Sequence, residues 1–192
     1  MRVLATERTL MLQIAPTISS THSRPGDVRT LARGMLCAFA LLCAWRPVAA
    51  ETSGPPAPDF ALRSLAGQNV RLSEHLGEVV LINFWASWCG ACREQMPHLE
   101  ELFTRYRRAG LVLLGVTLDE NRARAADMAA TLRISYPLLL DERKEVSRAY
   151  GVDTLPVTVL IDRAGAVRYV ASGYKPGYEQ RYAEKLRELL NE

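Results

Sequence analysis

Hydrophobic and polar residues alternate along the chain in patterns that predict strands and helices in turn. Near-continuous apolar runs at 78–86 and 111–118 are typical of central strands that are buried on both faces. Between them, the apolar residues of 89–108 recur at steps of three and four, which is helical spacing. Pro97 lies inside this helix, where it removes a backbone hydrogen bond and is expected to bend it. The centre of the chain is therefore predicted to be strand, helix and strand.

The same alternation continues on both sides of this centre. The expected strands are 60–62, 70–72, 78–86, 111–118, 136–140, 155–161 and 167–171, and the expected helices are 89–108, 121–132, 144–150 and 179–190. A turn at Asp162–Gly165 is expected to join the last two strands as a hairpin. Strands and helices that alternate and end in a hairpin predict a mixed α/β sheet with helices on both faces.

The composition favours a single domain and argues against one class of binding partner. With 192 residues, 48% of them hydrophobic, the chain has room for one domain with a sizeable core. The net charge of +3 comes from residues 1–50, because residues 51–192 hold 18 basic and 19 acidic residues. A nearly neutral body argues against nucleic acid as a partner. The acidic pair Asp119–Glu120 is expected to be solvated surface.

The first 50 residues have the order of a secretory signal peptide. Arg24, Arg29 and Arg33 precede the apolar run 34–45, and the small residues Val48–Ala50 follow it. The run is shorter than the roughly 20 residues that span a bilayer, which favours cleavage after Ala50 over an uncleaved membrane anchor. Residues 51–58 contain three prolines and are expected to form a linker to a domain at 59–192. The sequence thus predicts an exported, periplasmic protein.

Cleavage of the predicted signal peptide would determine which cysteines remain in the mature protein. Cys37 and Cys43 lie in the apolar run and leave with the signal peptide, so the mature chain keeps only Cys89 and Cys92. A disulfide between these two closes too small a loop to constrain much of the unfolded chain. The mature chain adds only two histidines, too few to complete a zinc site. The pair is therefore interpreted as a redox pair, and neither a metal nor an organic cofactor is expected.

The cysteine pair follows an apolar strand and opens a helix. Free backbone N–H groups and the positive end of the helix dipole favour a thiolate at Cys89, the expected attacking cysteine. Cys92 lies about one turn later and is expected to resolve the mixed disulfide. Trp85 and Trp88 either pack the core or offer apolar surface to a substrate, and the place of Trp88 beside the pair favours the second role. Arg93 either favours the thiolate by its charge or is simply exposed.

The pair belongs to a longer, ordered set of motifs. The set comprises Phe84–Arg93, Pro97, Leu155–Pro156, Ala57–Phe60, Gly115–Asp119 and Val159–Gly165. It resembles the thioredoxin superfamily and, more narrowly, the exported TlpA/ResA-type thiol:disulfide oxidoreductases. The resemblance implies a thioredoxin-like fold with an N-terminal β-hairpin and a central helix and strand insertion. It also implies disulfide exchange with protein thiols, as a reductant supplied by a membrane electron donor, in cytochrome c maturation or a related task.

The resemblance also assigns roles around the pair. Pro156 would be a cis-proline facing the disulfide, and Leu155 would pair its backbone with an extended substrate segment. Gly90 and Ala91, inside the pair, would tune the stability of the thiolate and hence the reduction potential. Ala91 stands where the family often has proline, so the potential is not transferable from a relative.

Two further departures concern proton handling. Gln95 stands where many relatives have glutamate, three residues after the second cysteine, and Asn83 stands where thioredoxin has a buried aspartate. An amide cannot act as a base at neutral pH. Cys92 is therefore predicted to keep its proton up to unusually high pH.

Two other functions stay open at this point. A peroxiredoxin-like thiol peroxidase shares the opening Ala57–Phe60, but its attacking cysteine normally follows a threonine at the position of Ala86. A non-catalytic binding module would use the fold and the Leu155–Pro156 edge for docking and leave the disulfide idle.

Overall fold

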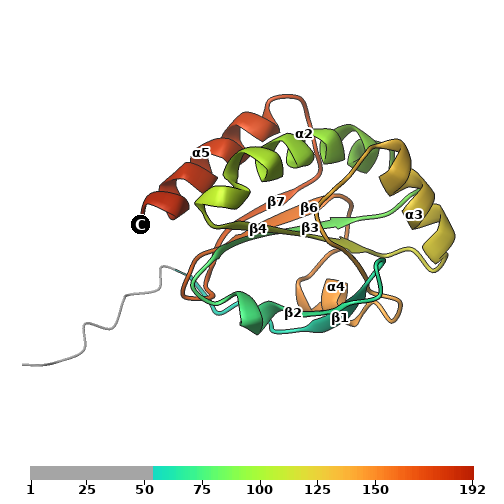
Figure 1. The fold of residues 1–192 in the computed structure, drawn as a ribbon, viewed down its shortest axis with the longest axis horizontal. Helices are drawn as coiled ribbons and strands as arrows, with labels where there is room; N and C mark the ends of the chain where they lie inside the picture. The colour runs from blue at the N-terminus through green and yellow to red at the C-terminus, as the bar shows by residue number, and fades with distance from the viewer. Residues whose placement is uncertain (1–53) are drawn as a thin grey trace, which may run out of the picture. The chain divides into compact units, whose positions relative to one another are not determined.

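Seven strands form one mixed sheet in residues 54–192, the range that this computed structural model describes (Figure 1). The strands are β1 (Ala61–Ser64), β2 (Asn69–Arg71), β3 (Val79–Trp85), β4 (Leu111–Thr117), β5 (Leu138–Leu140), β6 (Val157–Ile161) and β7 (Val167–Ser172). Their order in the sheet is β2-β1-β5-β4-β3-β6-β7. Strands β3, β4 and β5 run parallel, and the other neighbours are antiparallel. The predicted signal peptide, with Cys37 and Cys43, lies outside the described residues.

Helices cover both faces of this sheet. On one face lie α2 (Gly90–Tyr106), α3 (Arg122–Thr131) and α5 (Tyr178–Asn191), and on the other lies α4 (Glu145–Ala149) (Figure 1). The β1–β2 hairpin and the insertion of α3 and β5 after β4 also agree with the sequence prediction. Between residues 54 and 192, no helix has both the length and the apolar character needed to cross a membrane.

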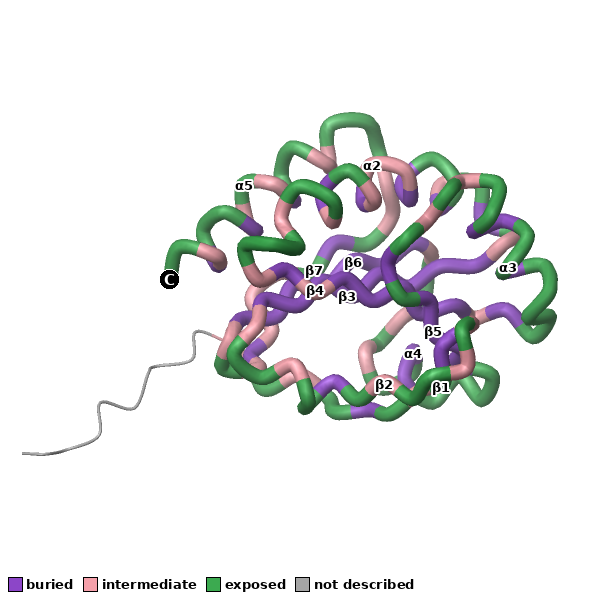
Figure 2. The backbone as a smooth tube through the Cα atoms, viewed as in Figure 1, coloured by how far each residue is buried: buried purple, intermediate pink, exposed green. Residues whose placement is uncertain are grey.

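The central strand β3 supplies both layers of the core. Its seven residues are all buried (Figure 2). Successive side chains of a strand point to opposite faces. The odd-numbered apolar residues, Val79, Leu81 and Trp85, pack under α2, α3 and α5. The even-numbered ones, Val80, Ile82 and Phe84, pack on the side of α4. Asn83 is the single polar member, and alternation puts it on the α2 side.

Strand register determines which loops meet at the site. In the parallel pair, Trp85 of β3 lies opposite Thr117 of β4. In the antiparallel pair, Asn83 of β3 lies opposite Thr158 of β6. The carboxyl ends of β3 and β4 therefore reach the same edge of the sheet, and α2 begins directly beyond it.

Most element boundaries differ from the sequence prediction by one or two residues, and two of the differences have a clear local cause. Leu72, expected to end a strand, opens a 3₁₀ helix, η1 (Leu72–His75), because Asp59 accepts hydrogen bonds from the N–H and hydroxyl of Ser73 and turns the chain. Strand β6 begins at Val157 rather than Leu155, since Pro156 has no N–H to donate to a ladder.

The stretch expected to be a linker makes backbone hydrogen bonds with the β6–β7 turn. The N–H of Val167 donates to the carbonyl of Pro55 at 2.8 Å, and the N–H of Ala57 donates to that of Gly165 at 2.9 Å.

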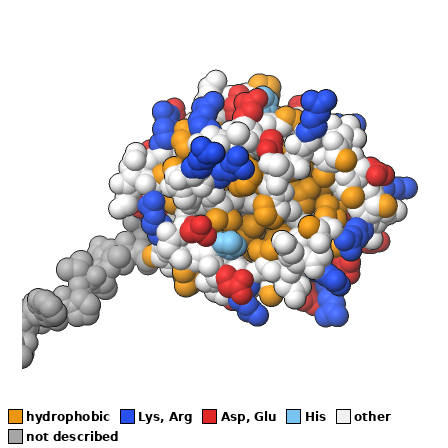
Figure 3. Space-filling model, in the orientation of Figure 1, with side chains coloured by type: hydrophobic (Ala, Val, Ile, Leu, Met, Phe, Trp, Pro, Cys, Tyr) orange, Lys and Arg blue, Asp and Glu red, His pale blue; other side chains and the backbone are white. Residues whose placement is uncertain are grey.

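Cationic and anionic side chains are intermixed around apolar patches on the face shown in Figure 3. This distribution agrees with the near-neutral charge of residues 51–192.

Candidate active site

Cys89 and Cys92 form a disulfide at the N-terminus of α2, with their sulfur atoms 2.13 Å apart. Cys89 is the N-cap residue, and its Sγ accepts a hydrogen bond from the N–H of Cys92 at 3.1 Å. Free N–H groups and the positive end of the helix dipole lie at this end of α2. Both favour a thiolate at Cys89 once the pair is reduced.

The two cysteines differ in access to solvent. Cys89 is 7% exposed, whereas Cys92 is 0% exposed. Gly90 and Arg93 are exposed and Ala91 is half-buried, so the outer side of the pair is open. Only the Cys89 sulfur can be reached by a second protein. This burial is compatible with the predicted order, in which Cys89 attacks and Cys92 resolves.

Apolar surface borders the pair on its outer side. Trp88 is 70% exposed, whereas Trp85 is fully buried and packs the core. Leu155 is half-buried and packs against the core cluster that includes both cysteines. The peptide bond between Leu155 and Pro156 is cis, as the resemblance implied, and Pro156 is buried. Trp88 is the large apolar side chain that a substrate would meet next to Cys89.

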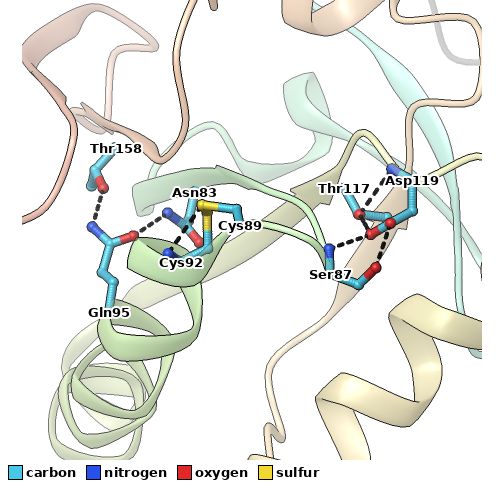
Figure 4. The surroundings of a disulfide bond; sticks show 8 residues. All are labelled: Asn83, Ser87, Cys89, Cys92, Gln95, Thr117, Asp119 and Thr158. Carbon is cyan, nitrogen blue, oxygen red and sulfur yellow. Dashed lines mark hydrogen bonds between the residues drawn. A yellow bond between two sulfur atoms is a disulfide. The ribbon is translucent and has the colours of Figure 1, made fainter.

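A buried amide network lies on the Cys92 side of the pair (Figure 4). Gln95 Oε1 accepts a hydrogen bond from Asn83 Nδ2 at 2.7 Å. Gln95 Nε2 donates to Thr158 Oγ1 at 3.0 Å and to the Tyr182 hydroxyl at 3.1 Å. Burial raises the pKa of Tyr182, so its hydroxyl stays protonated. Among the described residues, Asn83 Oδ1 has no hydrogen-bond donor.

A buried carboxylate holds the loop on the opposite side of the pair (Figure 4). Asp119 is 4% exposed and accepts hydrogen bonds from the Ser87 N–H at 2.8 Å, the Ser87 hydroxyl at 2.7 Å and the Thr117 hydroxyl at 2.7 Å. The expectation that Asp119 is solvated surface is therefore wrong. Its neighbour Glu120 is exposed, as expected, and pairs with Lys144 at 3.1 Å.

Sequence reasoning missed four polar residues of this site: Ser87, Asp119, Thr158 and Tyr182. Sheet register points to the first two. Asp119 and Ser87 each lie two residues beyond the Trp85 and Thr117 pair, so they meet at the same edge of the sheet. Thr158, like Asn83, is a polar residue inside an otherwise apolar strand. Tyr182 carries no such signal, because it precedes Leu186 and Leu189 at helical spacing and so has the pattern of an ordinary core residue.

Within residues 54–192, the side chains of His, Cys, Asp and Glu form no group of three or more that could hold a metal ion. The chemistry that this site offers is that of its two sulfur atoms.

Replacing Asp119 with alanine is expected to lower the free energy of unfolding by about 2–4 kcal/mol. The substitution leaves the donors of Ser87 and Thr117 unpaired in a buried place. Chemical denaturation of the oxidised protein measures the change. Glu120→Ala is the matched control, because it removes a surface ion pair worth less than about 1 kcal/mol. Equal losses in the two variants would contradict the clamping role of Asp119.

Comparison with known proteins places this geometry among thiol-active folds. Residues 53–170 match the model of the AhpC/TSA family. The chain is 37% identical over 120 residues to the thiol-disulfide oxidoreductase ResA of Geobacillus thermodenitrificans, which covers 62% of this chain and 69% of that protein. It is 31% identical over 138 residues to ResA of Halalkalibacterium halodurans, covering 72% and 77%.

A solved structure extends the comparison to the fold. A Chlorobium tepidum protein assigned as the thiol:disulfide interchange protein DsbE superposes with a TM-score of 0.69 at 34% identity. The match covers 71% of this chain and 96% of that protein. The thioredoxin-like fold implied by the sequence is confirmed.

Proposed function

The chain belongs to the AhpC/TSA family, and on this premise we propose that it is an exported thiol-disulfide oxidoreductase acting on other proteins. One observation carries the proposal: a disulfide at the start of α2 in which Cys89 reaches the surface and Cys92 does not. The names of the ResA and DsbE relatives support the same reaction.

The exchange takes place in two steps. The Cys89 thiolate attacks one sulfur of a substrate disulfide and forms a mixed disulfide with it, while the substrate S–S bond breaks and the other substrate sulfur leaves as a thiolate that takes up a proton. Cys92 then loses its proton and attacks Cys89 Sγ, which releases the substrate sulfur held in the mixed disulfide and forms the Cys89–Cys92 bond. The substrate is reduced by two electrons, and the protein dithiol is oxidised to the disulfide.

The proton of Cys92 is held by amides rather than carboxylates. Asn83 Oδ1 is buried and has no donor in the described, oxidised structure. We assign it as the acceptor of the Cys92 S–H after reduction, because a thiol is a donor and this side of the pair offers no free carboxylate (Figure 4). Release of the substrate then waits for water to remove the proton.

Repeated turnover requires electrons from outside the chain. Each reduced substrate leaves the pair as a disulfide, so a second thiol donor must restore the dithiol. For an exported protein, this donor is a membrane protein that passes electrons outward, and the task is cytochrome c maturation or a related reduction. The signal-peptide pattern of residues 1–50 and the TlpA/ResA-type motifs support this assignment.

A trapping experiment tests the proposal. In Cys92→Ser, Cys89 still attacks but the mixed disulfide is not resolved, so substrate proteins should accumulate on Cys89 in cells that produce the variant. Acid quenching, affinity capture and elution by reductant identify them by mass spectrometry. The double variant Cys89→Ser, Cys92→Ser should capture none. Recovery of no partner by the single variant would contradict exchange with proteins.

A thiol peroxidase is the second candidate, since the family match includes the opening Ala57–Phe60. The position that carries threonine in such enzymes is Ala86, which is buried and has no hydroxyl to bind peroxide. Rapid peroxide consumption that depends on Cys89 would favour this candidate. A binding module with an idle disulfide would instead keep its function in the double serine variant.

A further inference from the structure

A tight turn carries the chain from β3 to the redox pair. The N–H of Cys89 donates to the carbonyl of Ala86 at 3.1 Å, which closes a turn with Ser87 and Trp88 at its centre. Cys89, the last residue of this turn, is at the same time the N-cap residue of α2. The position of the attacking sulfur relative to α2 therefore depends on how the turn is held.

Asp119 holds the first central residue of the turn. Its carboxylate accepts hydrogen bonds from the Ser87 N–H at 2.8 Å and from the Ser87 hydroxyl at 2.7 Å (Figure 4). Within residues 54–192, no other side chain forms a hydrogen bond with Ser87 or Trp88. The fixation of the turn by side chains thus rests on one carboxylate.

This carboxylate is itself fixed to the end of β4. It accepts a third hydrogen bond from the Thr117 hydroxyl at 2.7 Å, and the Asp119 N–H donates to Thr117 Oγ1 at 3.2 Å. The N–H of Leu118 donates to the carbonyl of Trp85 at 3.0 Å, which joins this end of β4 to β3. Asp119 therefore ties the turn to the neighbouring strand of the sheet.

We propose that Asp119 is a positioning residue for the attacking cysteine: through Ser87, it keeps Cys89 at the N-cap of α2, where the helix stabilises the thiolate. The inference rests on the disulfide exchange proposed above and adds a residue to it. The Cys89 sulfur accepts a hydrogen bond from the Cys92 N–H at 3.1 Å and lies at the positive end of the helix dipole, whose effect falls off within the first turn. A turn that is free to move carries the sulfur away from this place for part of the time.

Two substitutions of Asp119 separate its hydrogen bonds from its charge. In Asp119→Asn, the amide oxygen can accept from the Ser87 N–H and the Thr117 hydroxyl, and the amide nitrogen can donate to the Ser87 hydroxyl, which rotates to accept. Asp119→Ala loses all three hydrogen bonds. Both variants lack the negative charge and keep every other charged side chain, so the difference between them reports the hydrogen bonds alone.

Alkylation of the reduced full-length protein by iodoacetamide measures the Cys89 thiolate, because the thiolate is the reactive form and Cys92 is 0% exposed. Mass spectrometry of the peptide that contains Cys89 follows this site alone. We expect Asp119→Ala to react about tenfold more slowly than Asp119→Asn at neutral pH, and at a similar rate at about pH 10, where the thiol is ionised in both. Ser87→Ala keeps the N–H donor and loses the hydroxyl, so its rate at neutral pH should lie between those of Asp119→Ala and the wild type.

Asp141→Ala is the matched control for general loosening of the fold. Asp141 is 1% exposed and accepts hydrogen bonds from the Ser147 N–H at 2.7 Å and the Val146 N–H at 3.3 Å, at the start of α4. It is a buried carboxylate with backbone donors, like Asp119, but it does not contact the turn before Cys89. Its loss should leave the alkylation of Cys89 unchanged.

The outcomes separate this inference from the proposed function. Equal alkylation rates of Asp119→Asn and Asp119→Ala at neutral pH overturn the positioning role, and so does an equal slowing in Asp141→Ala. If Asp119→Ala does not fold, Ser87→Ala decides, and a wild-type rate in that variant overturns the inference. Alkylation requires no disulfide substrate, so failure of the trapping experiment overturns the proposed exchange without changing this result.

Discussion

Replacing Cys89 with serine is expected to slow disulfide exchange at least about 10³-fold, to the level of a chain without a redox pair. A hydroxyl is not ionised at neutral pH and cannot replace the attacking thiolate. Serine is also a preferred N-cap residue, so it still accepts the hydrogen bond from the Cys92 N–H and preserves the start of α2. The loss therefore reports chemistry rather than unfolding. Reduction of a disulfide-bonded peptide, followed by thiol titration, measures it.

Cys92→Ser is the matched control for this prediction. It keeps the attacking sulfur, so the first step should proceed within about tenfold of the wild-type rate while release of the second product stops. Single-turnover kinetics distinguishes the two steps. If serine at position 92 abolished the first step and serine at position 89 did not, the two roles would be reversed.

Replacing Gln95 with glutamate is expected to accelerate the resolving step about 10²-fold at neutral pH, because it places a general base one helical turn from Cys92. The network can accommodate the carboxylate. Asn83 Nδ2 continues to donate to it, and the hydroxyls of Thr158 and Tyr182 rotate from accepting to donating. Few buried amides have partners that can all adapt in this way.

The rate of the resolving step should depend on pH differently in the wild type and in Gln95→Glu. In the wild type, resolution should quicken as the pH rises through the neutral range, since the proposed removal of the Cys92 proton by water and hydroxide becomes faster as hydroxide increases. In Gln95→Glu, the rate should be higher at pH 7 and should depend less on pH. Rapid mixing of the reduced protein with a disulfide peptide, quenched with acid at intervals, follows the mixed disulfide directly.

Two controls define the origin of the acceleration. Glu94→Gln removes an exposed neighbouring carboxylate and should leave the rate unchanged. Gln95→Met removes the hydrogen bonds without adding a base, so it should lower the free energy of unfolding by about 2 kcal/mol and give no acceleration. Faster resolution in the methionine variant would show that loosening of the network, rather than a base, is responsible.

The layers of the fold were predictable because near-continuous apolar runs identify β3 and β4 as buried strands. Alternation along β3 then assigns each side chain to one layer, since successive residues of a strand face opposite ways. The end of β2 was less predictable. Leu72 continues the apolar pattern of a strand, and it opens η1 because the next residue, Ser73, donates hydrogen bonds to Asp59, 14 positions earlier in the sequence.

The candidate site also has one part that the local sequence predicts and another part that depends on tertiary packing. Cys89 at the N-cap is a local feature, set by the strand before it and the helix after it, so the sequence was sufficient. The burial of Asp119 depends on which strands pair and in which register, and the contact of Tyr182 with Gln95 depends on how α5 packs across α2. Neither is contained in the residues next to the cysteines.

Because Gln95 contacts Tyr182 of the last helix, the surroundings of the cysteine pair are completed only at the end of synthesis. Synthesis runs from the N-terminus, so the two cysteines are made before α5. During that interval, the pair can meet oxidants while its buried surroundings are still incomplete. The thiol chemistry of the nascent chain is therefore that of a flexible peptide, and it becomes that of the mature site only when the last helix docks.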